Sequence, residues 1–153
     1  MQKPIIDETK LSETMRIIEM AAELMAEKDC DEDIEAKTTL EKLQQDLRII
    51  TDNKEINIRD YQRYWSAVDL KTVAEGTLMP VPEKEDLSDA QIKEIVVNIL
   101  KYSESEMTWW LNYLKVNTGL NNISDYIFYP DMLGMDSEAS LEQIADRIIA
   151  DKN

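Results

Sequence analysis

Residues 88–100 read SDAQIKEIVVNIL, and this segment has the features of an amphipathic helix. Ser88 can accept a hydrogen bond from an unpaired backbone amide at a helix N-terminus, and Asp89 adds negative charge where the helix dipole favours it. Apolar residues follow at three- and four-residue spacings, which place them on one face of a helix. We therefore expect a helix over residues 88–102.

A shift of about 49 residues aligns this segment with two others in the chain. The shift places Ser137 and Thr39 at the position of Ser88, so each segment begins with a residue that can cap a helix. It also pairs aromatic residues, Tyr61 with Trp110 and Tyr64 with Tyr113. Repetition at such a period is typical of duplicated helical units, whereas unrelated amphipathic helices align only in part.

These matches predict an all-α protein, a compact helical bundle with an internal duplication of a three-helix unit. Two units are too few for a long solenoid, so we expect a single helical domain, 1–153, with a long N-terminal helix packed across the units. Gly76 and Gly119 stand where helices are expected to end. The expected parts are a helix at 9–28, a first unit at 38–80 (helices 38–51, 58–68 and 69–76), a second unit at 88–130 (helices 88–102, 104–117 and 122–129) and a capping helix at 138–151.

The composition agrees with this fold class. Hydrophobic residues make up 43% of the 153 residues, enough for a core, and three glycines and four prolines are few for a β-rich fold. The single cysteine, Cys30, allows no intramolecular disulfide, and the sequence shows neither a signal peptide nor a long apolar span. We therefore expect a cytoplasmic protein of bacterial type.

The net charge restricts the kind of partner. The formal charge of -15 comes from 32 acidic and 17 basic residues. Such a balance disfavours broad contact with nucleic-acid phosphates and with anionic membranes, because both need clustered Lys and Arg. A basic protein would be attracted instead. The competing interpretation is that the charge serves solubility alone.

The absence of histidine narrows the available chemistry. It excludes Ser-His-Asp and Cys-His catalysis and histidine metal sites, and a single cysteine excludes Cys-rich zinc sites. Asp29, Asp31 and Asp33 have the spacing of a calcium loop, but Ile34 and Leu40 stand where glycine and glutamate are needed. We expect no enzyme activity, no cofactor and no metal site.

A magnesium-dependent nucleotide hydrolase is the alternative, because some all-α enzymes work with carboxylates alone. It would need four acids that converge from two helices. Glu32 with Glu35, and Glu83 with Asp86, have suitable spacing. Both pairs lie in acidic loop or linker sequence, which favours solvated surface charge.

Aromatic residues on the middle helix of each unit are the candidate partner-binding residues. Adjacent helix positions diverge by about 100°, so Trp109 and Trp110 cannot both point into one core. Exposed Trp and Tyr among acids would anchor an interface, whereas the competing interpretation packs them between helices. The six candidates are Tyr61, Tyr64, Trp65, Trp109, Trp110 and Tyr113.

The function predicted from these features is that of a small acidic protein-binding module for protein–protein interaction. Its partner would be a basic protein, such as a cationic toxin or a nucleic-acid-binding protein, which it would neutralise by covering the basic face. A third interpretation is structural. The methionine-containing apolar stripe of the helix at 9–28 would then form core or a homodimer contact.

Overall fold

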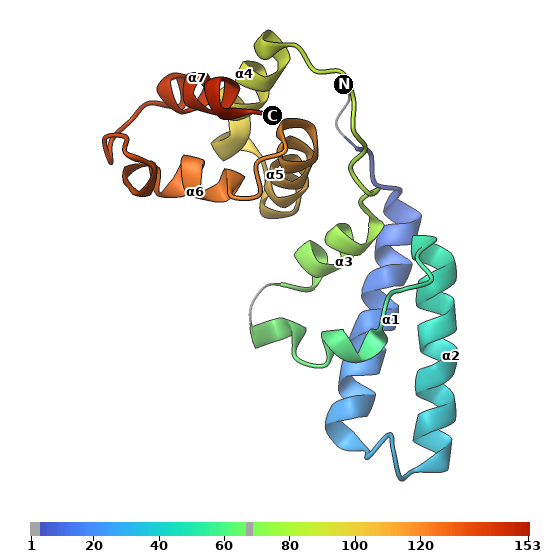
Figure 1. Ribbon diagram of the computed structural model, residues 1–153. Coiled ribbons are helices and arrows are strands. Elements are labelled where there is room, and N and C mark those ends of the chain that lie inside the picture. Colours follow the sequence, from blue (N-terminus) through green and yellow to red (C-terminus); the bar gives the residue numbers. More distant parts are fainter. Residues whose placement is uncertain (1–3, 67–68) are drawn as a thin grey trace. The chain divides into compact units, whose positions relative to one another are not determined.

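The computed structural model describes residues 4–66 and 69–153, and within these ranges every regular element is a helix. The predicted all-α class is confirmed. The chain divides into two compact units, Met1–Pro80 and Val81–Asn153, and each has a hydrophobic core of its own residues (Figure 1). The boundary falls in the proline-containing segment between the two expected helical units. A single domain over 1–153 stays a prediction.

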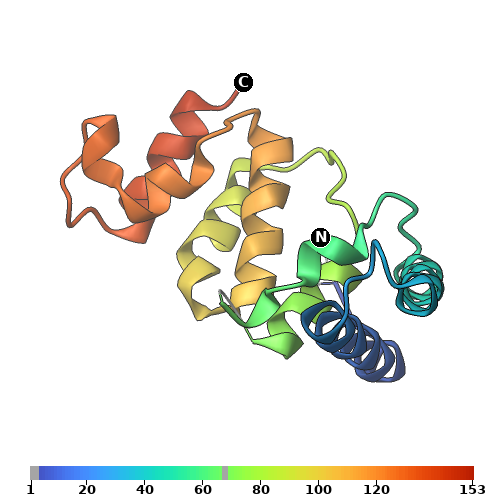
Figure 2. The ribbon, with the colours of Figure 1, turned by 90° about the horizontal axis from the view of Figure 1, so that it is seen from below.

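In its described residues, 4–66 and 69–80, the first unit contains three α-helices and two short 3-10 helices. The long helices α1 (Glu8–Glu27) and α2 (Ile34–Thr51) lie side by side (Figures 1 and 2). The chain then forms η1 (Ile58–Tyr61) and η2 (Tyr64–Ser66) before α3 (Leu70–Leu78). Helix α1 contacts α2, α3 and η1, so the expected N-terminal helix is the central element of this unit.

Aspartates begin both long helices. The Asp7 carboxylate accepts hydrogen bonds from the amides of Thr9 and Lys10, and Asp33 does the same for Ala36. The prediction that Thr39 caps the second helix is wrong, because α2 begins five residues earlier, and the Thr39 hydroxyl donates to the Glu35 carbonyl. Asp33 is the last residue of the acidic run 29–33, which lies between α1 and α2.

The prediction of an α-helix at 58–68 is also wrong for residues 58–66, which the structure describes. Two 3-10 helices stand there, and residues 67–68 lie outside the described ranges. Ile56 and Ile58 are both buried at a spacing of two, which an α-helix cannot place on one face. Hydrogen bonds from Arg48 Nε to the Ile56 carbonyl (3.0 Å) and from the Ile58 amide to Gln44 (3.1 Å) hold this segment on α2.

The second unit contains four α-helices. They are α4 (Asp89–Asn98), continued by η3 (Ile99–Lys101), then α5 (Glu104–Thr118), α6 (Ile123–Phe128) followed by η4 (Pro130–Leu133), and α7 (Leu141–Asp151). Helix α4 packs on α7. Two ion pairs join these helices, Lys93 to Asp146 at 3.3 Å and Lys152 to Asp89 at 2.5 Å.

Capping serines begin α4 and α7, but only one lies where the repeat predicts. Ser88 forms a capping box with Gln91, as its sequence position indicates. The last helix is capped by Ser140, which forms the same box with Gln143, so the predicted cap at Ser137 is wrong. The observed boxes are therefore out of the 49-residue register by three residues, and the internal duplication stays a prediction.

Of the two glycines predicted at helix ends, only Gly119 lies at one. Gly119 ends α5 with φ of 74°, the left-handed conformation that glycine adopts without strain. Gly76 lies inside α3, which continues to Leu78, so that prediction is wrong.

Candidate functional site

The aromatic residues predicted to bind a partner have different environments in the two units. In the second unit, Trp110 and Tyr113 are each 3% exposed and belong to the core, while Trp109 is half-buried against it. The Trp109 ring stacks on Tyr113, with centroids 5.1 Å apart, and meets Trp110 edge-on at 4.9 Å. Tyr102 stacks on Trp110, with ring centroids 5.6 Å apart. Trp110 and Tyr113 therefore offer a partner no exposed side-chain surface.

Tyr113 has a second structural role, because its hydroxyl donates a hydrogen bond to the Glu85 carboxylate. Burial of the hydroxyl, this hydrogen bond and the charge of Glu85 all raise the pKa of Tyr113 above its usual value. Asn117 adds two bonds, accepting from the Glu85 amide (2.6 Å) and donating to the Glu83 carbonyl (3.1 Å). The segment before α4 is thus fastened to α5.

In the first unit, the aromatic residues are more accessible. Tyr61 and Tyr64 are half-buried against the core, and Trp65 is 58% exposed. The rings of Tyr64 and Trp65 meet edge-on with centroids 5.6 Å apart. Trp65 is therefore the candidate whose side chain is presented to solvent.

Two acidic residues of α1, Glu19 and Glu23, act electrostatically on Tyr64 of this aromatic pair. Partial burial, together with the charges of Glu19 and then Glu23, raises the pKa of Tyr64. Both glutamates are exposed, and Met20 between them is 42% exposed. We call Tyr64, Trp65, Glu19 and Glu23 the Trp65 surface. It combines an exposed aromatic side chain with two carboxylates.

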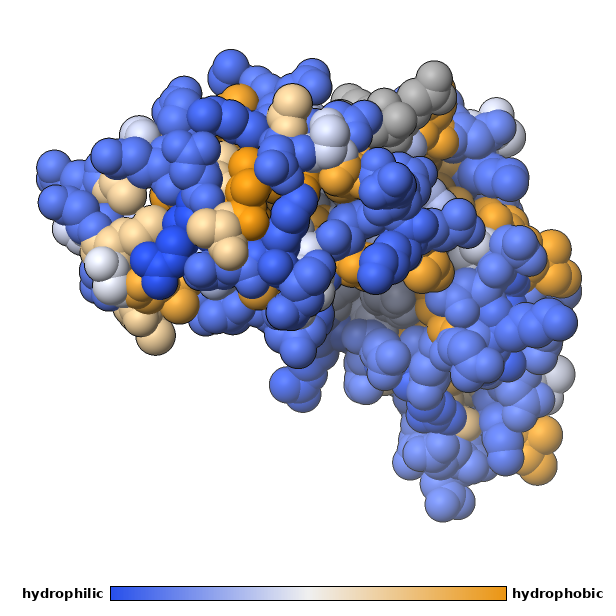
Figure 3. Space-filling view, turned by 45° about the horizontal axis from the view of Figure 1, so that its top comes forward, coloured by the Kyte–Doolittle hydropathy of each residue, from blue (hydrophilic) through white to orange (hydrophobic). Residues whose placement is uncertain are grey.

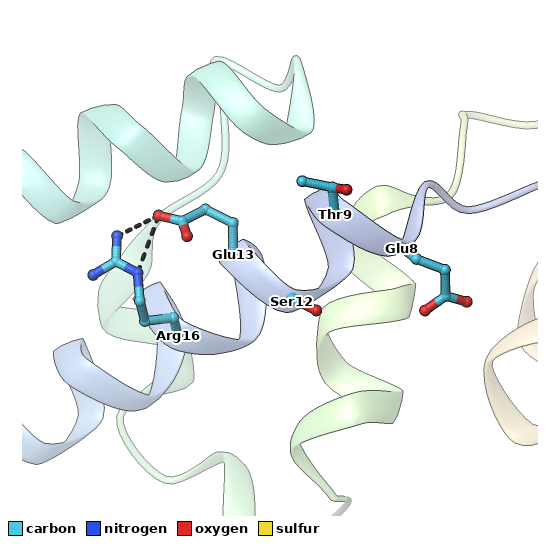
Figure 4. Close-up of a pocket in the computed structure, with 5 residues that line it drawn as sticks. All are labelled: Glu8, Thr9, Ser12, Glu13 and Arg16. Atoms are coloured by element: carbon cyan, nitrogen blue, oxygen red, sulfur yellow. Dashed lines mark hydrogen bonds and ion pairs between the residues drawn. The ribbon is translucent and has the colours of Figure 1, made fainter.

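The neighbouring cation on α1 is paired already. The Arg16 guanidinium donates two hydrogen bonds to Glu13 and a third to Met20 Sδ at 3.0 Å. The hydrogen bond with Arg16, more than its charge, lowers the pKa of Glu13. Both residues line a shallow hollow with Glu8, Thr9 and Ser12 (Figure 4). All five lining residues come from one helix, so this hollow is the flank of α1, with no second element to enclose a small ligand.

In the part of the chain that the structure describes, the acids considered for magnesium belong to no metal-binding cluster. Glu32, Glu35, Glu83 and Asp86 are exposed. Within residues 4–66 and 69–153, no group of three or more His, Cys, Asp or Glu residues is placed to hold a metal ion. Asp29 accepts from the amides of Asp31 (3.0 Å) and Glu32 (3.3 Å) and so forms a turn.

Comparison with known proteins adds no family. No family model, no curated protein and no solved structure matches the chain. The class defined by the structure is thus an all-helical protein of two compact units. In its described part, no helix has the length and apolar character needed to span a membrane.

Proposed function

We propose that this chain is a non-enzymatic binding protein whose Trp65 surface captures a basic segment of a partner protein. The observation that carries the proposal is that Trp65 is 58% exposed. Its ring contacts Tyr64, whose pKa is raised in part by the charges of Glu19 and Glu23. A large aromatic side chain left in water is unusual for a residue that could have packed in the adjacent core, and Trp is a frequent interface anchor.

A Lys or Arg side chain suits both parts of this surface. Its cation would lie over the ring of Trp65, an arrangement worth about 0.5–1 kcal/mol at an exposed site and more when water is excluded. The carboxylates of Glu19 and Glu23 would receive its hydrogen-bond donors. The net charge of -15 would speed the encounter with a basic partner and weaken contact with anionic surfaces.

In the cell, such capture would neutralise the partner by covering its basic face. A cationic toxin or a nucleic-acid-binding protein would lose access to its own anionic target in this way. We place this activity in a bacterial-type cytoplasm.

The test is calorimetric titration of the full chain with a short synthetic peptide of arginine and serine. We expect binding that weakens steeply between about 50 and 300 mM salt, because exposed charges are screened. Trp65→Ala should weaken binding about tenfold, equivalent to about 1.4 kcal/mol. The matched control is Leu100→Ala, which shortens another exposed apolar side chain and should bind as the unaltered chain does.

The carboxylates are tested separately. The double substitution Glu19→Gln/Glu23→Gln should lower the affinity for the peptide at low salt. It should also make the affinity less dependent on salt concentration, because it removes two negative charges from the Trp65 surface. Glu41→Gln/Glu94→Gln removes the same charge from other exposed positions and serves as the control. Equal affinity of the Trp65→Ala chain and the unaltered chain at low salt would reject the Trp65 surface as the binding site.

The other two interpretations have no observation in their favour. The magnesium hydrolase requires converging carboxylates, but the candidates for that role are exposed, and the described residues contain no group of three or more acids placed to hold a metal ion. The homodimer through α1 requires a free apolar stripe, but Leu11, Ile18 and Met25 of that stripe are buried within the first unit.

A further inference from the structure

The second unit presents three large apolar side chains where α6 passes into η4. Phe128 is 44% exposed, Tyr129 57% and Met132 69%. We call these three residues the α6–η4 surface. Figure 3 shows apolar side chains among hydrophilic ones at the left of the view, where Figure 1 places α6 and the segment leading to α7. The neighbouring Tyr126 and Ile127 are buried, so the segment has an inner face that packs and an outer apolar face that does not.

The backbone holds this outer face in a defined shape. Pro130, between the exposed residues, is buried and begins η4. The Met132 amide donates to the Tyr129 carbonyl (3.0 Å), and the Met135 amide donates to the Pro130 carbonyl (3.1 Å). Gly134 closes the turn with φ of 80°. A preorganised surface loses little conformational freedom when a partner binds, which favours affinity.

The segment of chain that carries the α6–η4 surface is acidic, and Arg147 of α7, whose charge acts on Tyr126, is paired with Asp151. Residues 116–146 contain six acids and no Lys or Arg. Asp131 lies on η4 itself and Asp136 just beyond it, and both are exposed. Among the residues that the structure describes, the ion pairs of the second unit use other acids, namely Asp89, Asp146 and Asp151. The charges of Asp131 and Asp136 are therefore available to an external cation.

From this juxtaposition of exposed apolar side chains with exposed acids, we infer a second docking surface, which binds a basic amphipathic segment of a partner protein. Its aliphatic or aromatic residue covers Phe128 and Met132, and its Lys or Arg residues meet Asp131 and Asp136. A second copy of this chain would bring acids against acids, and an anionic membrane would be repelled in the same way. The inference rests on the proposed function in one respect, namely that the partner is basic. It concerns other residues of this chain, and it requires in addition that the partner's segment carries apolar side chains.

The experiment compares two synthetic peptides of equal length and equal charge with the full chain. One carries Lys and Leu with the leucines at helical spacing, and the other carries Lys and Ser. We expect the Lys–Leu peptide to bind about tenfold more tightly, because its leucines bury apolar surface of the protein. Phe128→Ser/Met132→Ser should abolish this difference. Leu100→Ser/Val116→Ser, which alters exposed apolar residues elsewhere in the same unit, should preserve it.

A second measurement needs no variant of the surface. The methyl resonance of Met132 should shift when the Lys–Leu peptide is added to the unaltered chain, and should shift little with the Lys–Ser peptide. Equal affinity of the two peptides for the unaltered chain, or an unchanged Met132 resonance, would overturn the inference. The inference would also be overturned if the unaltered chain formed a dimer and the substitutions Phe128→Ser/Met132→Ser dissociated it. A second copy of the chain would then occupy the surface.

The outcomes distinguish this inference from the proposed function. Salt-sensitive binding of the Lys–Ser peptide that Trp65→Ala weakens, without any gain from leucine, would retain the Trp65 surface and reject the α6–η4 surface. A leucine-dependent gain that persists in Trp65→Ala would support the α6–η4 surface even if the Trp65 surface failed.

Discussion

Thr14 and Thr118 are both buried on helices, yet their hydroxyl groups differ in hydrogen bonding. The Thr118 hydroxyl donates to the Leu114 carbonyl at 2.7 Å and accepts from the Leu120 amide at 3.3 Å. The Thr14 hydroxyl is buried and has no hydrogen-bond partner among the residues that the structure describes. An unpartnered buried hydroxyl costs about 1–3 kcal/mol of desolvation. The two residues therefore contribute to stability with opposite sign, although their types and burial are the same.

Replacement of each threonine by valine tests this difference. Thr14→Val should raise the free energy of unfolding by about 1 kcal/mol, because a methyl group replaces an unsatisfied hydroxyl. Thr118→Val should lower it by about 1 kcal/mol or more, because the Leu120 amide loses its acceptor. Urea denaturation of the full chain measures both. A destabilised Thr14→Val chain would mean that its hydroxyl is satisfied in solution.

At the scale of the helices, capping side chains determine the residue at which a helix begins. Local sequence identifies Ser88 correctly because serine, an acid and an amphipathic run follow one another there. The same local pattern occurs at Ser137, but α7 begins only after Ser140. Ser140, unlike Ser137, has a glutamine three residues later, as Ser88 does, and this capping box sets the start of α7. Thr39 fails for a related reason, since Asp33 offers an earlier start.

The capping box of α7 can be tested by alanine substitution. Ser140→Ala should lower the free energy of unfolding by about 1 kcal/mol, because the Gln143 amide loses its acceptor. The matched control is Ser137→Ala, which changes an exposed serine outside the helix and should have almost no effect. A larger loss from Ser137→Ala than from Ser140→Ala would restore the register of the predicted repeat.

At the scale of the whole molecule, the main feature is that each unit has a core built from its own residues. In the second unit, buried side chains of α4, α5, α6 and α7 form one cluster, and its fully buried members include Ile92, Ile99, Leu114 and Ile148. A unit of this kind can be expected to fold alone, although a small core leaves a narrow margin of stability.

A fragment comprising Val81–Asn153 should therefore be helical and unfold cooperatively on heating. Circular dichroism and the dispersion of its amide resonances would measure this. As a control, Leu114→Ala in the fragment removes a fully buried side chain and should lower its melting temperature or unfold it. A fragment without helical signal would show that the second core depends on the first unit.

The exposure of the candidate aromatic residues could not be predicted from local sequence. Trp109, Trp110 and Tyr113 were correctly placed on a helix, but helical spacing does not tell which face a neighbouring helix covers. Trp65 was expected on an α-helix, but the structure has a short 3-10 helix there, and the Trp65 side chain is exposed. The α6–η4 surface cannot be predicted from the sequence, because apolar residues at a helix end are equally compatible with burial, and only packing leaves Phe128, Tyr129 and Met132 exposed.

Composition and periodicity alone establish that this chain is acidic, all-helical and without histidine chemistry, because these properties are local or simply additive along the chain. They also locate most helices to within a few residues. Which aromatic side chains become core and which remain in solvent is decided by packing in each unit. The physical reason is that burial depends on what lies opposite a side chain, and that neighbour is distant in the sequence.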